Sequence, residues 1–152
     1  MTSSPTTPIA ERPEPERIYL FVQHLGRRLR DIDAQAGLTP ARFSTLASLR
    51  FHGSRNIGDL AADERVRPPS MTRLVRDMER DGLLARTPDP ADGRGVLIEL
   101  TPAAAVLFDT ARAQKIALVA DFLETLSRPA QTAIRIAFAA LDDLAEPPEP
   151  SS

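Results

Sequence analysis

The residues of this chain that could do chemistry lie on one face of a helix predicted between Pro68 and Gly82. Four apolar residues have the i, i+3, i+4, i+7 spacing of a buried helical stripe: Met71, Leu74, Val75 and Met78. Because successive helical residues are about 100° apart, four polar residues share the opposite face: Thr72, Arg73, Arg76 and Arg80. Such a row of guanidinium groups suits phosphate oxygens and the acceptor atoms of base edges. A solvated amphipathic helix has the same pattern, so the neighbouring elements must distinguish the two interpretations.

Catalytic groups are sparse in the rest of the sequence. There are two histidines, His24 and His52, and no Gly-x-Ser-x-Gly motif, glycine-rich phosphate loop or pair of residues with metal-ligand spacing. The absence of cysteine excludes disulfides, thiolate metal sites and thiol redox sensing. We therefore expect no enzyme activity, no cofactor and no bound metal.

The composition is that of one ordinary globular domain. Of the 152 residues, 42% are hydrophobic and 26% are charged. No run approaches the roughly 18 consecutive apolar residues of a membrane span, and no secretory signal is recognisable, so we expect a cytoplasmic protein. The net charge of −2 is a weak indication either way, because the acidic residues are concentrated towards the ends. Residues 65–94 hold seven arginines against five acids.

The prolines mark chain ends and turns. Seven of the fourteen lie in residues 1–15 and 147–150, so loose tails are expected over 1–13 and 146–152. The other seven stand where a helix would begin or a turn would form, and none interrupts an apolar repeat. This pattern predicts a single, mostly helical domain over residues 14–145.

Two helices are expected at the start of that domain. An apolar stripe runs over residues 14–36 and stops at Gly37. Thr39 and Pro40 then provide the N-cap and first position of a second helix, which ends near Gly53.

A short third helix is expected after Asn56, whose side chain can cap it, with Asp59 at the capping-box position. Its predicted core residues are Leu60, Ala61 and Val66. Residues 63–67 leave room only for a tight turn before the helix that begins at Pro68.

A hairpin and two further helices are predicted after Gly82. The strands are expected over residues 83–87 and 96–100, joined by a loop rich in proline and glycine. A long helix follows Thr101, and a last one begins near Pro129. Both are apolar on more than one face, which favours a subunit interface shared with the first helix. A thicker helical core within one chain is the alternative.

The order of short helix, tight turn, second helix and hairpin is that of a winged helix-turn-helix, and the sequence resembles the MarR family of dimeric bacterial transcription regulators. The matching stretches are Asp59-Leu60-Ala61, Pro68 to Val75, Glu79 to Leu84, Asp89 to Arg94 and Leu100-Thr101. The resemblance covers about residues 14–145. It implies a mainly α fold with a small β-hairpin wing, the winged helix-turn-helix lying at about 39–101. Dimerisation helices are implied at about 14–36 and 102–145.

Some residues depart from the family pattern around the turn. Glu64 stands where an apolar residue is common, Arg65 where a turn glycine is common, and Arg67 where a Ser or Thr often caps the next helix. Ala104 lies close to a common glycine. We therefore expect the turn to be closed differently, and the helix at Pro68 to lack a side-chain acceptor at its cap.

The resemblance implies binding to double-stranded DNA. Its candidate contacts are Arg67, Pro69, Ser70, Thr72, Arg73, Arg76 and Arg94. The turn from Ser70 to Arg73 is expected at base edges or adjacent phosphates, and free N–H groups at the start of the helix could hold a phosphate. Arg94, at the hairpin tip, is expected in the minor groove, with Asp92 shaping the turn or orienting it. Arg80 is expected to contact phosphate or to pair with a nearby acid.

The resemblance also implies a repressor of a pseudo-palindromic site with half-sites about one helical turn apart, released by a small aromatic or anionic effector. Candidate pocket residues are Tyr19, His24, Phe43 and His52. The alternative is a winged-helix module for protein interaction, in which the arginine face meets an acidic partner without specific DNA binding. A small hydrolase is a third interpretation, disfavoured by the scarcity of histidine.

Overall fold

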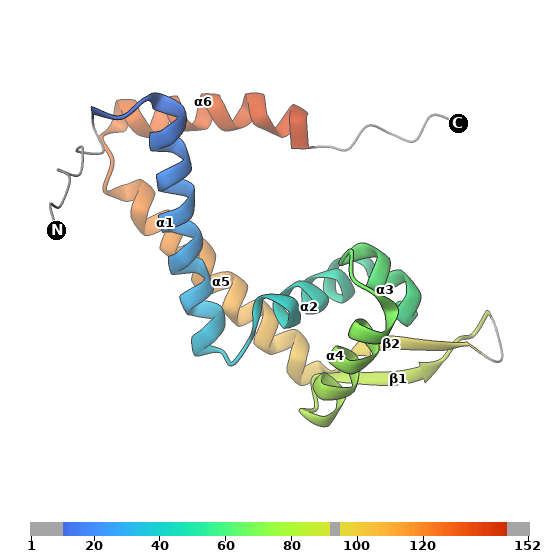
Figure 1. The fold of residues 1–152 in the computed structure, drawn as a ribbon. Helices are drawn as coiled ribbons and strands as arrows, with labels where there is room; N and C mark the ends of the chain where they lie inside the picture. Colours follow the sequence, from blue (N-terminus) through green and yellow to red (C-terminus); the bar gives the residue numbers. More distant parts are fainter. Residues whose placement is uncertain (1–10, 92–94, 146–152) are drawn as a thin grey trace, which may run out of the picture. The chain divides into compact units, whose positions relative to one another are not determined.

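The computed structural model describes residues 11–91 and 95–145 (Figure 1). The described elements are α1 (Glu14–Gln35), α2 (Pro40–His52), α3 (Ile57–Asp63), α4 (Pro68–Arg80), β1 (Leu84–Pro88), β2 (Val96–Leu100), α5 (Pro102–Glu124) and α6 (Arg128–Ala145). This order confirms the predicted fold class, mainly α with a winged helix-turn-helix. The chain divides into two compact units, Met1–Arg112 and Ala113–Ser152, which are described in turn.

Side-chain caps begin four of the described helices, at Thr39, Asn56, Thr101 and Ser127. The Thr39 hydroxyl accepts a hydrogen bond from the Arg42 N–H at 3.3 Å, and the Thr101 hydroxyl accepts one from the Ala104 N–H at 3.2 Å. Asn56 Oδ1 accepts from the Asp59 N–H at 2.8 Å. The Asp59 carboxylate in turn accepts from the Asn56 side-chain amide rather than from its backbone N–H, so the cap is a variant of the capping box.

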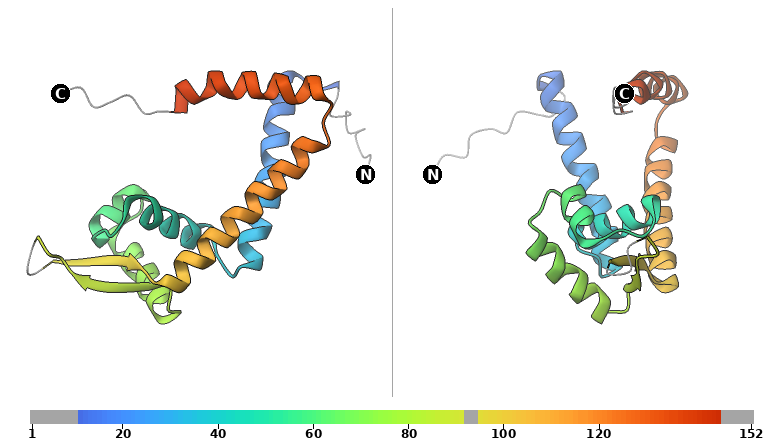
Figure 2. Two further views of the ribbon diagram at one scale, coloured as in Figure 1. Left: turned by 180° about the vertical axis from the view of Figure 1, so that it is seen from behind. Right: turned by 90° about the vertical axis from the view of Figure 1, so that its right-hand side faces the viewer.

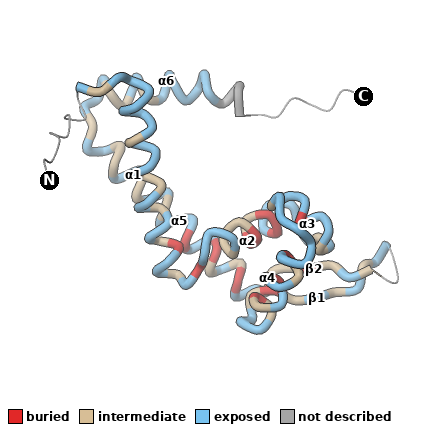
Figure 3. Tube along the Cα trace, in the orientation of Figure 1, coloured by how far each residue is buried: buried red, intermediate tan, exposed pale blue. Residues whose placement is uncertain are grey.

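The core of the first unit lies among α2, α3, α4, the hairpin and the start of α5, where the buried residues gather (Figure 3). Met71, Val75 and Met78 of α4 are at most 1% exposed, and Leu74 packs against them while half-buried. This confirms the predicted apolar stripe. Full burial of each such side chain contributes roughly 1.5–3 kcal/mol. The packing of α4 against the core is therefore one of the more stabilising contacts of the unit.

The turn between α3 and α4 is closed by a residue in the left-handed conformation. Arg65 has φ 53°, its N–H donates to the Ala62 carbonyl at 3.1 Å, and the Val66 N–H donates to the Ala61 carbonyl at 2.9 Å. These two bonds form a Schellman motif, in which glycine is the usual left-handed residue. The expectation of a different closure is wrong, because the arginine itself adopts the geometry that favours glycine.

Val66 is not a core residue, contrary to the sequence prediction. Its side chain is 43% exposed, whereas Leu60 and Ala61 are buried. The reason is that α3 ends at Asp63 and the left-handed Arg65 breaks the helical repeat. Position 66 therefore does not continue the buried face.

The hairpin is joined to the helices at several points. β1 and β2 form an antiparallel hairpin (Figure 2, left). Leu84 pairs with Leu100, and β1 begins one residue later than the sequence predicts. Arg55, just before α3, exchanges two backbone hydrogen bonds with Ile98 at 2.7 and 3.0 Å. The Thr101 hydroxyl donates to the Gly82 carbonyl at 2.8 Å. The wing is thus tied to the segments on both sides of the helix-turn-helix.

The second unit contains the end of α5 and α6. Gln131 Nε2 donates to the carbonyls of Leu123 and Leu126 at 3.1 and 3.0 Å, which fixes the turn between the two helices. Among the side chains of α6 that the structure describes, Ile136, Phe138 and Leu141 are large, apolar and exposed. In the first unit, α1 likewise exposes Ile18, Tyr19, Phe21 and Val22. Within the described part of the chain, no helix is at once long and apolar enough to cross a membrane.

Replacing Arg65 by glycine is expected to stabilise the protein. A left-handed non-glycine residue costs roughly 1–2 kcal/mol, and the greater freedom of glycine in the unfolded chain offsets part of the gain. Arg65→Gly should raise the free energy of unfolding by about 0.5–1 kcal/mol in urea titrations. Gly82, at φ 73° in the matching motif after α4, is the control. Gly82→Ala should destabilise by about 1 kcal/mol, and equal effects of the two changes would contradict the explanation.

Candidate nucleic-acid interface

The start of α4 has no backbone donor to offer a ligand. Its first two residues, Pro68 and Pro69, lack an N–H. The next two N–H groups, of Ser70 and Met71, both donate to the Arg67 carbonyl, at 2.9 and 3.2 Å. The expectation that free N–H groups here could hold a phosphate is therefore wrong. Arg67 is the N-cap residue and provides no side-chain cap, as predicted, so the first turn of α4 offers an anion its side chains and no free N–H.

The side chains on the outer face of α4 are accessible. Arg67, Pro69, Ser70, Arg73 and Arg76 are all exposed. Pro69, Arg73 and Arg76 lie on the face opposite the buried stripe, Ser70 lies at the edge of that face, and Arg67 precedes the helix.

Thr72 differs from its neighbours on that surface. It is half-buried, and its hydroxyl donates to the Pro68 carbonyl at 2.9 Å. The hydroxyl proton is therefore used within the helix. What Thr72 can still offer outward is an acceptor lone pair and a methyl group, which suits apolar contact with a thymine methyl.

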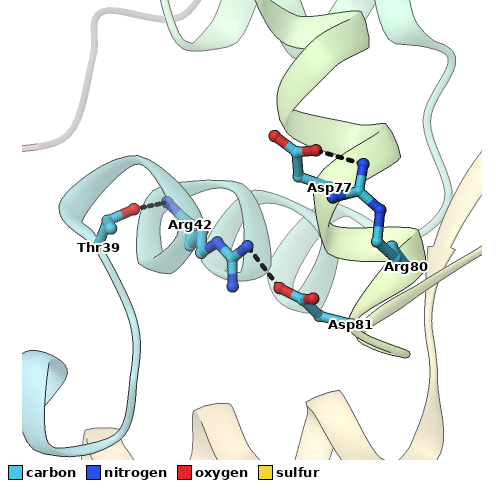
Figure 4. A network of polar contacts seen from close by, with 5 residues as sticks. All are labelled: Thr39, Arg42, Asp77, Arg80 and Asp81. Carbon is cyan, nitrogen blue, oxygen red and sulfur yellow. Dashed lines mark hydrogen bonds and ion pairs between the residues drawn. The ribbon is translucent and has the colours of Figure 1, made fainter.

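Charge is distributed unevenly along α4. In its C-terminal half every acid has an arginine partner: Asp77 with Arg80 at 2.9 Å, Glu79 with Arg86 at 2.7 Å and Asp81 at its C-cap with Arg42 at 2.5 Å. Figure 4 shows the first and last of these pairs. Arg80 is thus an intramolecular partner, one of its two predicted roles.

The arginines that precede these acids on α4, and the one just before the helix, are different. Arg67, Arg73 and Arg76 form no ion pair among the described residues. Exposed ion pairs add little stability, but they do neutralise charge. Unpaired positive charge on this helix is consequently concentrated between the residue before it and its third turn.

The sequence reasoning missed Arg42 and Arg86 as partners of the α4 acids. Arg86 could have been suspected, because β1 begins only a few residues after α4. Arg42 lies 39 residues from Asp81, and no local spacing relates the two.

Asp92 and Arg94, at the hairpin tip, lie outside the described residues. The base of the loop is described: the Asp89 N–H donates to the Gly95 carbonyl at 3.0 Å, and the Asp89 carboxylate accepts from the Ala91 N–H at 2.8 Å. Asp89 therefore closes the loop as an Asx turn, a role that the sequence reasoning did not assign.

The four candidate pocket residues lie in different settings. Tyr19 and His24 are exposed on α1. Phe43 is half-buried and packs its ring against Phe108, with centroids 5.0 Å apart. His52 is exposed at the end of α2, its Nδ1 lying 3.1 Å from the Ser48 carbonyl oxygen. Phe43 therefore has a packing role in the first unit, whatever else it contacts.

Known proteins resemble the chain across most of its length. A model of the MarR family matches residues 38–96. An HTH-type transcriptional regulator of Mycobacterium tuberculosis is 36% identical over 120 residues, which are 79% of this chain and 84% of that protein. The HTH-type transcriptional repressor MdtR of Bacillus subtilis is 33% identical over 91 residues, or 60% of this chain and 59% of that protein.

Solved structures share the fold. A MarR family protein from Bacillus stearothermophilus has a TM-score of 0.73 at 24% identity, covering 85% of this chain and 90% of that one. A variant of MepR from S. aureus, bound to an oligodeoxyribonucleotide, has a TM-score of 0.73 at 18% identity over 90% and 100%. NadR in complex with 4-hydroxyphenylacetate has a TM-score of 0.60 at 23% identity over 93% and 96%. With 36% identity to the M. tuberculosis regulator over most of both chains, and a family model matching its helix-turn-helix, this chain belongs to the MarR family of DNA-binding transcriptional regulators.

Proposed function

We propose that this regulator is a homodimeric repressor that reads a pseudo-palindromic DNA site with α4 and the hairpin. The observation that carries the proposal is the distribution of charge on α4. Its first turns expose arginines with no acidic partner among the described residues, while the acids of its last turns are all paired. The repressor MdtR, 33% identical over 91 residues, supports repression as the direction of control.

In this proposal α4 lies in the major groove, which is wide enough for a helix. Arg73 and Arg76 are one helical turn apart on the exposed face and reach guanine O6 and N7 or neighbouring phosphates. Ser70 provides a hydroxyl, and Thr72 packs its methyl group on the base edges. Arg67 binds phosphate with its side chain, because the two prolines after it offer no N–H, and Pro69 fits against the backbone.

The wing completes the contact. Arg94 enters the adjacent minor groove, where a guanidinium responds to groove width and A·T content. Asp92 shapes the turn or orients this arginine. The MepR variant of the same fold is bound to an oligodeoxyribonucleotide, which supports DNA as the ligand in this proposal.

Two copies of the chain are proposed to form the dimer that binds DNA. α1 and α6 each expose large apolar residues that a monomer would leave in water. Covering them between two copies gives a dimer whose two-fold axis matches a palindrome, with half-sites about one helical turn apart. The domain in this proposal is residues 14–145, with tails at 1–13 and 146–152.

A small aromatic or anionic effector is proposed to release the repressor from DNA. NadR binds 4-hydroxyphenylacetate, and its fold covers 93% of this chain. Tyr19, His24, Phe43 and His52 remain the candidate contacts. The proposal includes no catalytic activity, and it puts the protein in the cytoplasm, where a bacterial chromosome lies.

Selection of bound fragments from random duplex DNA tests the proposal. Enrichment of a palindrome with half-sites about 10 base pairs apart is expected. Recovery of no sequence, with no DNA binding even at low salt, would instead favour the alternative of a protein-interaction module.

Arg73→Ala is expected to weaken binding to the selected site by about 1–3 kcal/mol and to relax preference at one base pair per half-site. The reason is loss of a bidentate contact to guanine. Fluorescence anisotropy with a set of single-base-substituted duplexes measures both effects. Arg80→Ala is the matched control on the same helix, since its guanidinium already pairs with Asp77. If Arg80→Ala relaxes base preference as much as Arg73→Ala does, the assignment is wrong.

Arg94→Ala is expected to weaken binding with little effect on base preference in the major groove, and to lower the slope of log affinity against log salt by about 1. Its contact is proposed to be with the minor groove, which discriminates poorly between sequences. Titrations at several salt concentrations measure the slope. Arg86→Ala, in the same hairpin but paired with Glu79, should leave the slope unchanged. A shifted major-groove preference in Arg94→Ala would contradict this role.

A further inference from the structure

Three acids stand at helix ends where they are electrostatically unfavourable. Asp63 is the last residue of α3, Glu64 is its C-cap, and Asp81 is the C-cap of α4. The C-terminal end of a helix carries the negative end of the helix dipole, which disfavours a carboxylate. Intrinsic helix stability therefore does not explain these residues.

Each of these carboxylates receives a donor from α2. The Ser44 hydroxyl donates to Glu64 Oε1 at 2.7 Å, and the Ser48 hydroxyl donates to Asp63 Oδ2 at 3.2 Å. Arg42 Nη2 lies 2.5 Å from Asp81 Oδ2 (Figure 4). Hydrogen bonds to a charged acceptor are the stronger class. α2 therefore makes hydrogen bonds to the C-terminal ends of both α3 and α4, the two helices of the helix-turn-helix.

These contacts lie where they can fix the orientation of α3 and α4 relative to α2. Ser48 is buried, Ser44 is half-buried, and the Arg42 side chain is only 22% exposed. Ser44 and Ser48 are one helical turn apart on α2, so they hold the end of α3 at two points. Arg42 holds the end of α4 opposite to its proposed base-reading turn. Directed hydrogen bonds add an angular preference to the fit that the apolar core already imposes on the helix.

We propose that Arg42, Ser44 and Ser48 are positioning residues for DNA reading, which set the orientation of α4 through Asp81, Glu64 and Asp63. The inference rests on the proposed function, because it concerns how α4 is presented to DNA. None of the six touches DNA. Their loss changes the angle of the helix and so the fit of its base contacts, while the exposed arginines that attract any duplex are untouched.

The test compares specific with non-specific binding by the full chain. The probes are the duplex recovered by selection and a shuffled duplex of the same length. Arg42→Ala, and Ser44→Ala combined with Ser48→Ala, should each lower affinity for the selected duplex about tenfold. Affinity for the shuffled duplex at low salt should change by less than about twofold. Arg42→Lys, which keeps the charge, should recover most of the loss.

Arg50→Ala is the matched control. Arg50 is also an arginine of α2, and it makes two hydrogen bonds to Asp109 of α5 at 3.1 and 3.2 Å rather than to the helix-turn-helix. It should leave both affinities unchanged. In a double-mutant cycle, Arg42→Ala combined with Asp81→Ala should bind no more weakly than either single variant. Equal losses on both duplexes, additive losses in the cycle, or the same loss in Arg50→Ala would overturn the inference.

A second measurement does not depend on DNA. Hydrogen–deuterium exchange of the free protein should be faster in α3 and α4 for Arg42→Ala than for Arg50→Ala. If the wild-type protein selects no sequence, the proposed function fails and this comparison still decides the positioning role. Faster exchange confined to the Arg42 variant supports it, and equal exchange in the two variants overturns it.

Discussion

The burial of one face of α4 is the constraint on which the rest of the first unit depends. Met71, Val75 and Met78 are packed among α2, α3, the hairpin and the start of α5, so the helix can present only its opposite face to solvent. The turn before it and the wing after it are short, and both are tied by backbone hydrogen bonds. Because one face of α4 is buried and both of its ends are held by hydrogen bonds, the helix holds its exposed side chains in fixed positions.

The distribution of charge on α4 follows from this constraint. An exposed acid beside a proposed phosphate contact would be repelled, and the acids of α4 are paired at the end away from its unpaired arginines. The net charge of −2 therefore says little about affinity for DNA. What matters is the local arrangement, in which arginine serves two purposes. Arg42, Arg80 and Arg86 neutralise acids of α4 and its C-cap, whereas Arg67, Arg73 and Arg76 form no ion pair among the described residues.

Much of the fold could be predicted because its signals are local. The stripe on α4, the caps at Thr39, Asn56 and Thr101, and the turn glycines are all encoded within a few residues of where they act. The prediction that Val66 is buried is wrong because the helical repeat ends at Arg65. Nothing in the local sequence indicates that this arginine adopts the left-handed conformation. The pair of Arg42 and Asp81 was missed because it joins distant segments. Pro68 and Pro69 show from the sequence alone that two N–H donors are missing, and this local fact outweighs the general tendency of helix starts to bind phosphate.

The two prolines at the start of α4 have a consequence for how the regulator would find its site. Amide groups at a helix start hold a phosphate in one fixed place, whereas guanidinium groups on long side chains follow a phosphate as it moves past. A helix that offers only the second kind of contact lets the protein shift along the backbone without first breaking a rigid bond. In the proposed complex, the first turn of α4 therefore contacts phosphate through flexible side chains alone, and contacts of fixed geometry are left to the base edges.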